Sequence, residues 1–147
     1  MKSILDKETR DELIQRISQL QENKPAQWGK MNIYQMLKHC TLWEEMAFGK
    51  KKYKRAFIGL LFGKMALRNV LKDERPLMRN TPTLSALRIT ENGDVEAEKK
   101  KWISLMEEYA HFPDTGIMHP FFGKMTREQI GQLSFKHTDH HLRQFNV

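Results

Sequence analysis

Cysteine is almost absent from this chain of 147 residues, and long apolar runs are missing altogether. The single Cys40 excludes an internal disulfide, which agrees with a reducing compartment. No stretch approaches the roughly 18 consecutive apolar residues that a membrane-spanning helix needs, and the first residues turn polar too soon for a secretory signal. We therefore expect a cytoplasmic protein that has no membrane partner.

The sequence also lacks internal repeats, low-complexity tracts and persuasive alternation of polar and apolar residues. Its length suits one domain, so we expect a single domain over residues 1–147. Apolar residues recur instead with helical period. With their capping residues, five helices are predicted over residues 9–21, 32–48, 53–72, 94–110 and 126–145.

Several predicted helices begin at residues that favour a helix start. Thr9 with Glu12 and Thr126 with Gln129 match the capping-box pattern, and Asn32 and Asp94 are suitable N-caps. The amphipathic stripes predict an all-α protein, an antiparallel four-helix bundle with an additional helical segment between its second and third core helices. That segment, 53–72, contains two glycines, each of which weakens a helix by about 1 kcal/mol relative to alanine.

Three of the six histidines lie within five positions near the end of the chain. At about 100° per residue, His137 and His141 fall on the apolar stripe of the last helix, and His140 falls at its edge. His39 lies inside a broad apolar arc of the second helix. The spacing therefore predicts that His39, His137 and His141 all point toward the core.

Burying an imidazole without a partner costs roughly 1 to 3 kcal/mol, and a bound metal ion offsets that cost. Three neutral imidazoles suit Zn, Ni, Fe or Co, and they leave one coordination position open for water or substrate. The alternative is that each histidine simply donates a hydrogen bond to a buried carbonyl or carboxylate. The residues by themselves leave both interpretations open.

Three segments carry a family resemblance, namely 28–31 (WGKM), 119–126 (HPFFGKMT) and 136–145 (KHTDHHLRQF). Together with one histidine on the second helix and His-x-x-x-His on the last, they resemble an uncharacterised branch of the DinB-like (DinB/YfiT-like) metalloenzyme superfamily. The resemblance implies a metal site at His39, His137 and His141, with His140 as the rival for the last position. Zn or Ni is the metal it favours, with Fe or Co as further candidates.

The resemblance implies a metal-dependent enzyme that acts on a small molecule, either as a thiol-dependent S-transferase or as a hydrolase. In the first case the partner is a low-molecular-weight thiol, and a homodimer is also implied. His119 and His140 are candidates for moving a proton, although His119 suits equally well a loop anchored by a backbone hydrogen bond. Asp139 lies on the side of the last helix opposite His137 and His141, which favours a solvated surface position over a role as a catalytic acid. The alternative function is a non-catalytic, stress-related bundle that binds a metal or another ligand.

Positive charge is concentrated in one segment, 49–79, which holds ten Lys or Arg against Asp73 and Glu74. Because no DNA-reading or RNA-reading module is recognisable, we favour a solvated helix surface over a nucleic-acid partner. A third interpretation is that the charges attract an anionic small molecule to a nearby pocket.

Overall fold

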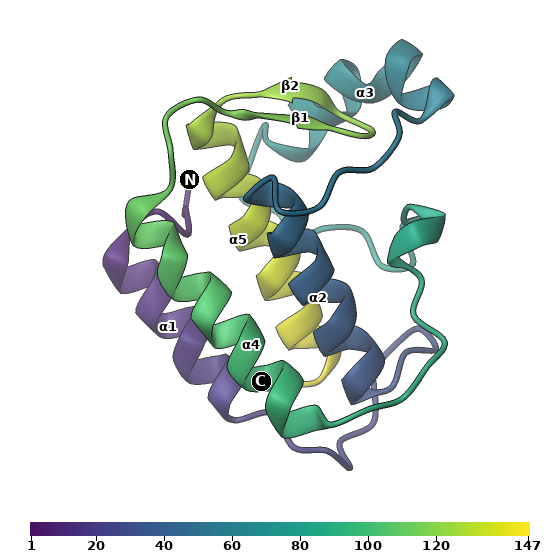
Figure 1. The fold of residues 1–147 in the computed structure, drawn as a ribbon, viewed down its shortest axis with the longest axis vertical. Coiled ribbons are helices and arrows are strands. Elements are labelled where there is room, and N and C mark those ends of the chain that lie inside the picture. The colour runs from purple at the N-terminus through teal and green to yellow at the C-terminus, as the bar shows by residue number, and fades with distance from the viewer.

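The computed structural model describes residues 1–147 and is predominantly helical (Figure 1). Its elements are α1 (Lys7–Ser18), α2 (Ile33–Ala47), α3 (Phe57–Val70), α4 (Val95–Glu108) and α5 (Arg127–Gln144), two short 3-10 helices, η1 (Ser85–Leu87) and η2 (Tyr109–His111), and two strands, β1 (Ile117–His119) and β2 (Gly123–Met125). All five predicted helices are present. None of them has the length and apolar character that crossing a membrane demands.

Side-chain capping fixes the starts of three helices as predicted. Capping boxes open α2, through Asn32, and α5, through Thr126, and the Asp94 carboxylate accepts a backbone hydrogen bond at the start of α4. The capping box predicted at Thr9 is wrong, because α1 begins two residues earlier at Lys7. The buried Arg10 guanidinium donates to the carbonyls of residues 4 and 5, which ties the preceding segment to the first turn of the helix.

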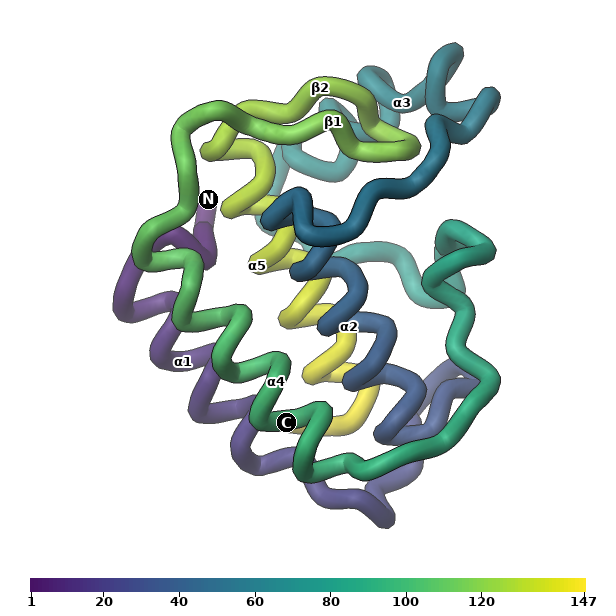
Figure 2. The backbone as a smooth tube through the Cα atoms, in the orientation of Figure 1, coloured from purple at the N-terminus to yellow at the C-terminus, as the bar shows by residue number.

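Four helices, α1, α2, α4 and α5, lie side by side around the core (Figures 1 and 2). Their directions differ from the antiparallel arrangement that we expected. Ion pairs join Lys38 to Glu98 near one end of α2 and α4, and Lys50 to Glu108 near the other, so these neighbours run parallel. The long connection between α3 and α4 makes this possible, because it returns the chain to the end of the molecule where α2 begins (Figure 2).

A small antiparallel hairpin corrects the all-α expectation. Strands β1 and β2 pair from Ile117 with Met125 to His119 with Gly123, just before α5 begins. Each strand has only three residues, which is too short for an alternating pattern to stand out in the sequence. Gly123 has a φ of +83°, a conformation that glycine adopts without the steric cost of a side chain.

Helix α3 rests on this hairpin, at the edge of the molecule (Figure 1). Gly59 and Gly63, which weaken the helix, let the Phe121 backbone approach it closely, since a Cβ at either position would collide with the Phe121 carbonyl oxygen. At the other end of α3, the Lys136 ammonium of α5 donates to three main-chain carbonyls, those of Val70, Asp73 and Arg75, at 2.6 to 2.9 Å. Both anchors fix α3 relative to α5.

The core between α2, α4 and α5 contains a buried carboxyl group. Glu44 is fully buried, and one of its oxygens accepts a 2.5 Å hydrogen bond from the Tyr109 hydroxyl. The Tyr109 hydroxyl also contacts the Ser134 hydroxyl, at 2.8 Å. The Ser134 oxygen in turn accepts a hydrogen bond from Trp43 Nε1 at 3.3 Å. Burial raises the pKa of Glu44 to about 8, although the Tyr109 hydrogen bond opposes the shift. Near neutral pH the folded protein therefore holds Glu44 mostly protonated.

This raised pKa predicts that the protein loses stability as pH rises. The unfolded chain releases the Glu44 proton near pH 4.5, and the folded chain releases it only near pH 8. The stability that this proton contributes to the folded state is therefore complete below pH 4.5 and is lost as the pH rises through 8. Glu44→Gln should flatten the pH dependence of the free energy of unfolding between pH 5.5 and 8 by roughly 2 to 4 kcal/mol. Urea unfolding at several pH values measures it.

The exposed Glu107 on the neighbouring helix provides the matched control. Glu107→Gln should leave the slope of stability against pH as it is in the unmodified protein. An unchanged slope in Glu44→Gln would contradict the assignment of a buried, protonated carboxyl group.

Candidate metal centre

Two neighbouring helices bring together the three histidines that the sequence singled out. His39 comes from the middle of α2, and His137 and His141 come from the last two turns of α5, which crosses it in the opposite direction. One ring nitrogen from each lies within 4.8 Å of the others, and the Nε2 atoms of His39 and His137 are 3.0 Å apart. The side chains therefore converge on one point between the helices.

The three rings pack directly against one another. The centroid distances are 5.1 Å from His39 to His137, 4.9 Å from His39 to His141 and 4.7 Å from His137 to His141. Trp43, one turn after His39, stacks on His137 with centroids 4.6 Å apart and an interplanar angle of 26°. Since Ser134 holds the indole nitrogen, this tryptophan forms a fixed wall beside the His137 ring.

Hydrogen bonds on the far side of two rings set their orientation. His39 Nδ1 donates to the Leu87 carbonyl of η1 at 2.9 Å, and His141 Nδ1 donates to Gln144 Oε1 at 2.9 Å. The Gln144 amide is fixed in turn, because its nitrogen donates to the Trp28 carbonyl at 2.8 Å. With Nδ1 protonated in both rings, the lone pairs lie on the Nε2 atoms, as in metal-binding histidines that are oriented by an outer hydrogen bond.

His137 has no such outer partner. Its Nδ1 is buried without a hydrogen bond, while its Nε2 faces that of His39. A buried polar nitrogen without a partner costs roughly 1 to 3 kcal/mol, so hydrogen bonding within the protein explains this residue poorly. An ion bound among the three rings would take the lone pair of the nitrogen that faces them, and the donor set suits a divalent transition metal.

The electrostatics of the cluster keep all three imidazoles neutral. Burial lowers the pKa of His39 and, much further, the pKa values of His137 and His141, and the neighbouring imidazoles lower them again. Neutral imidazole is the form that binds a metal ion. At pH 7 the cluster is therefore in its metal-binding protonation state.

His119, a sequence candidate for proton transfer, has a different set of contacts. It is buried at the end of β1, and its Nδ1 accepts the backbone N–H groups of Phe121 and Phe122, both at 3.1 Å. Its ring packs against Trp43 at 5.1 Å. Burial, aided by the nearby Arg55, lowers the pKa of His119 to about 4. Of the two interpretations left open by the sequence, these contacts match the one in which His119 anchors its loop.

His140 lies beside the cluster rather than in it. Its ring contacts His141 at 5.1 Å and Trp28 at 5.4 Å, and it lines a hollow of about 670 Å³ together with Arg79 and Arg143. His140 was the alternative to His141 as the third metal ligand. The ring nitrogen that lies close to those of His39 and His137 belongs to His141.

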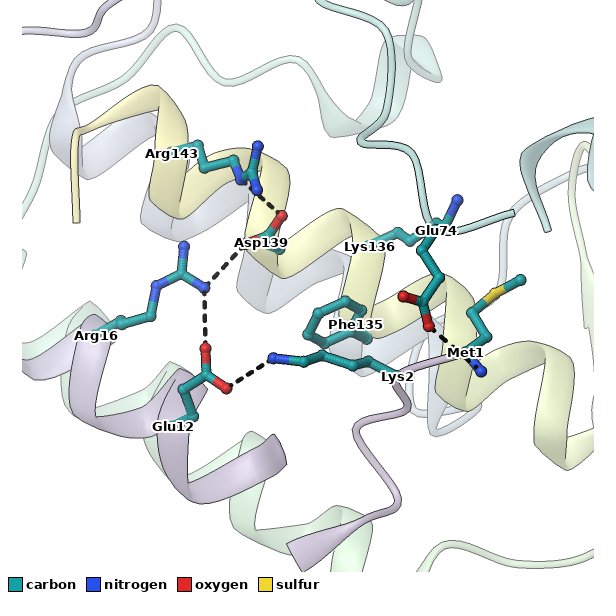
Figure 3. A pocket seen from close by; sticks show the side chains of 9 residues that line it. All are labelled: Met1, Lys2, Glu12, Arg16, Glu74, Phe135, Lys136, Asp139 and Arg143. Carbon is teal, nitrogen blue, oxygen red and sulfur yellow. Dashed lines mark hydrogen bonds and ion pairs between the residues drawn. The ribbon is translucent and has the colours of Figure 1, made fainter. Parts of the chain in front are cut away.

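The solvated position expected for Asp139 is wrong. Its side chain is only 16% exposed and pairs with Arg16 of α1 at 2.9 Å and with Arg143 at 3.0 Å. These pairs line a hollow of about 320 Å³. Figure 3 shows its side chains, among them Lys2, which pairs with Glu12. Because its charges pair with one another across α1 and α5, this hollow serves the packing of the two helices and lies apart from the histidines.

Sequence reasoning missed the residues that orient the cluster. Gln144 was recognisable, because it follows His141 by three positions and shares the inward stripe. Leu87 and Trp28 contribute only main-chain carbonyls, which every residue has, so no sequence signal points to them. Trp43 lies one turn after His39 in the sequence, but nothing in the sequence indicates its contact with the His137 ring.

Comparison with known proteins identifies the family. The family model described as "Protein of unknown function (DUF1569)" matches residues 1–147, so the chain belongs to that family. No significant match was found among curated proteins or among solved structures.

The hydrogen bonds predict which nitrogen carries the proton in each buried ring. His39 and His141 should be Nδ1-protonated, because their Nδ1 atoms face oxygen acceptors, and His119 should be Nε2-protonated, because its Nδ1 accepts two N–H groups. Long-range ¹H–¹⁵N NMR correlations at neutral pH distinguish the tautomers. An Nε2-protonated His39 or His141 would contradict the arrangement of lone pairs described above.

Proposed function

We propose that this member of the DUF1569 family is a metal-dependent enzyme in which His39, His137 and His141 hold one divalent transition metal ion. The observation that carries the proposal is the convergence of three ring nitrogens within 4.8 Å. Two of these rings, His39 and His141, are oriented by hydrogen bonds at Nδ1. Zn and Ni suit three neutral imidazoles best, and Fe or Co also suits them. Three protein ligands leave a coordination position for a reacting molecule.

The arrangement of the helices supports a wider relationship. Helices α1, α2, α4 and α5 surround the core, with α3 inserted between the second and third of them. A histidine on the second helix faces a pair four residues apart on the last. These features agree with a four-helix bundle of the DinB/YfiT-like type, to which we propose that the chain is related.

The reaction that we favour joins a small thiol to an electrophile, with hydrolysis as the sister reaction. A metal ion at this site would act as a Lewis acid and lower the pKa of a bound thiol or water. The protein's own part is to keep the three imidazoles neutral, through burial, and to fix two of them, through Leu87 and Gln144.

Of the two candidates for proton transfer, the contacts favour His140. The Nδ1 of His119 is occupied by two backbone N–H groups, so this ring has no free lone pair with which to accept a proton. His140 lines the hollow beside Arg79 and Arg143, whose positive charges suit an anionic substrate such as a thiol that bears a carboxylate.

A non-catalytic metal-binding or ligand-binding protein is the second candidate function. It is favoured by the small exposure of two of the three rings, since His39 is 4% and His141 is 6% exposed, whereas His137 is partly exposed. A structural metal site is closed to solvent, whereas a catalytic one must admit its substrate. Activity measurements on the metal-loaded protein separate the two functions.

The metal content of the purified protein tests the site. Chain purified without a histidine tag should contain about one transition metal ion per molecule, as three imidazoles on one point predict. The double variant His137→Ala/His141→Ala should lose it, because a single remaining imidazole binds weakly. Elemental analysis by mass spectrometry gives both values.

His140→Ala is the matched control, since it removes a neighbouring imidazole that lies outside the cluster. This variant should keep its metal. Metal retained by the double variant, or lost equally from His140→Ala, would refute the assignment of the three ligands.

Catalysis is tested by following the loss of a thiol in the presence of a generic alkylating electrophile. The rate should fall to the uncatalysed value when the metal is removed by a chelator, and it should return when the metal is restored. The double histidine variant should be inactive under all conditions. A fully metal-loaded protein that is inactive toward several thiols and toward activated esters would favour the non-catalytic function.

A further inference from the structure

Helix α3 presents an unusually apolar surface to solvent. Six large side chains along it are between 50% and 74% exposed, namely Phe57, Ile58, Leu60, Leu61, Phe62 and Met65. We call these six residues the apolar face of α3. Single exposed apolar residues are ordinary on protein surfaces, whereas a contiguous group of this size marks an interaction site.

Contacts at both ends of α3 hold this face outward. The opposite side of the helix carries the two glycines, which lie against the Phe121 backbone. A larger residue at either position would collide with that backbone, so only this side of the helix fits the hairpin. Arg55, just before the helix, donates to the His119 carbonyl at 2.7 Å, and Lys136 binds the carbonyls at its end. The helix is therefore fixed in an orientation that exposes its apolar side chains.

The same segment is strongly basic. Residues 49–72 contain no Asp or Glu, and they hold eight basic residues, Lys50, Lys51, Lys52, Lys54, Arg55, Lys64, Arg68 and Lys72. Lys50 and Lys51 pair with acidic residues of other elements, while Lys64 and Arg68 are exposed on α3 itself, on the same side of the helix as the apolar face. The surface around the apolar face thus carries uncompensated positive charge.

We propose that α3 docks on the surface of an anionic lipid bilayer, with its apolar face among the acyl chains and its basic residues at the headgroups. A helix that combines exposed Phe, Leu and Ile with Lys and Arg is typical of interfacial membrane binding. This contact is peripheral, which agrees with the lack of a spanning helix but departs from our expectation of no membrane partner. Figure 1 shows α3 beyond the hairpin at one end of the molecule, where the other helices leave its outer side free.

Charge complementarity favours a bilayer over the other occupants. A second copy placed face to face would bring Lys64 and Arg68 close to the same residues of its partner, and like charges repel. A nucleic acid would satisfy the basic residues but leave six apolar side chains against phosphates and water. An anionic lipid bilayer provides both an apolar phase and negative charge.

Cosedimentation of the full chain with vesicles tests the proposal. The protein should bind vesicles of equal parts phosphatidylglycerol and phosphatidylcholine about tenfold more strongly than vesicles of phosphatidylcholine alone, and salt should weaken the binding. Leu61→Ser/Met65→Ser should lower the partition coefficient about tenfold, since both side chains leave the apolar phase. Lys64→Glu/Arg68→Glu should also lower it about tenfold, because it reverses two charges at the headgroups.

Lys30→Glu/Lys100→Glu is the matched control, because it makes the same change of net charge at exposed positions outside α3. It should bind the anionic vesicles as the unmodified protein does, and circular dichroism should show that all variants are folded. Failure of the unmodified protein to bind anionic vesicles would overturn the proposal, as would undiminished binding by Leu61→Ser/Met65→Ser. A dimer that this variant dissociates, without vesicle binding by the unmodified protein, would assign the face to a second copy instead.

Discussion

Three imidazoles share one buried point between α2 and α5, and the surrounding structure is organised around the cost of placing them there. Neutral rings avoid the larger penalty of burying charge, and burial itself keeps them neutral. Leu87 and Gln144 satisfy the outer nitrogens of two rings, the inner Nε2 atoms of His39 and His137 face each other at 3.0 Å, and Nδ1 of His137 has no partner. The metal ion that we propose at this point would couple its binding to folding.

Other parts of the molecule are connected to the same region of α5. Lys136, next to His137, binds the carbonyls at the end of α3, and Ser134 holds Trp43 against the His137 ring. The hairpin loop contacts both α3 and α2. The Phe121 backbone lies against the glycines of α3, and the His119 ring packs against Trp43 of α2. One helix therefore positions the histidine cluster, the buried polar group around Glu44 and the exposed helix α3.

The helical periodicity predicted the five helices and the inward direction of His39, His137 and His141, because both depend on local spacing. It could not predict the parallel course of α2 and α4, which depends on how a long connection crosses the molecule. The hairpin is too short for its period to be visible. Asp139 was misplaced because its partner, Arg16, lies on a helix whose distance from α5 the sequence does not specify. The carbonyls of Leu87 and Trp28 carry no side-chain signal.

Crystallographic anomalous scattering at the metal absorption edge tests the central claim most directly. Crystals of the untagged protein, grown in the presence of Zn or Ni, should show one strong anomalous peak within bonding distance of the Nε2 atoms of His39, His137 and His141. A peak at His140 or elsewhere on the surface, with none among these three rings, would contradict the account.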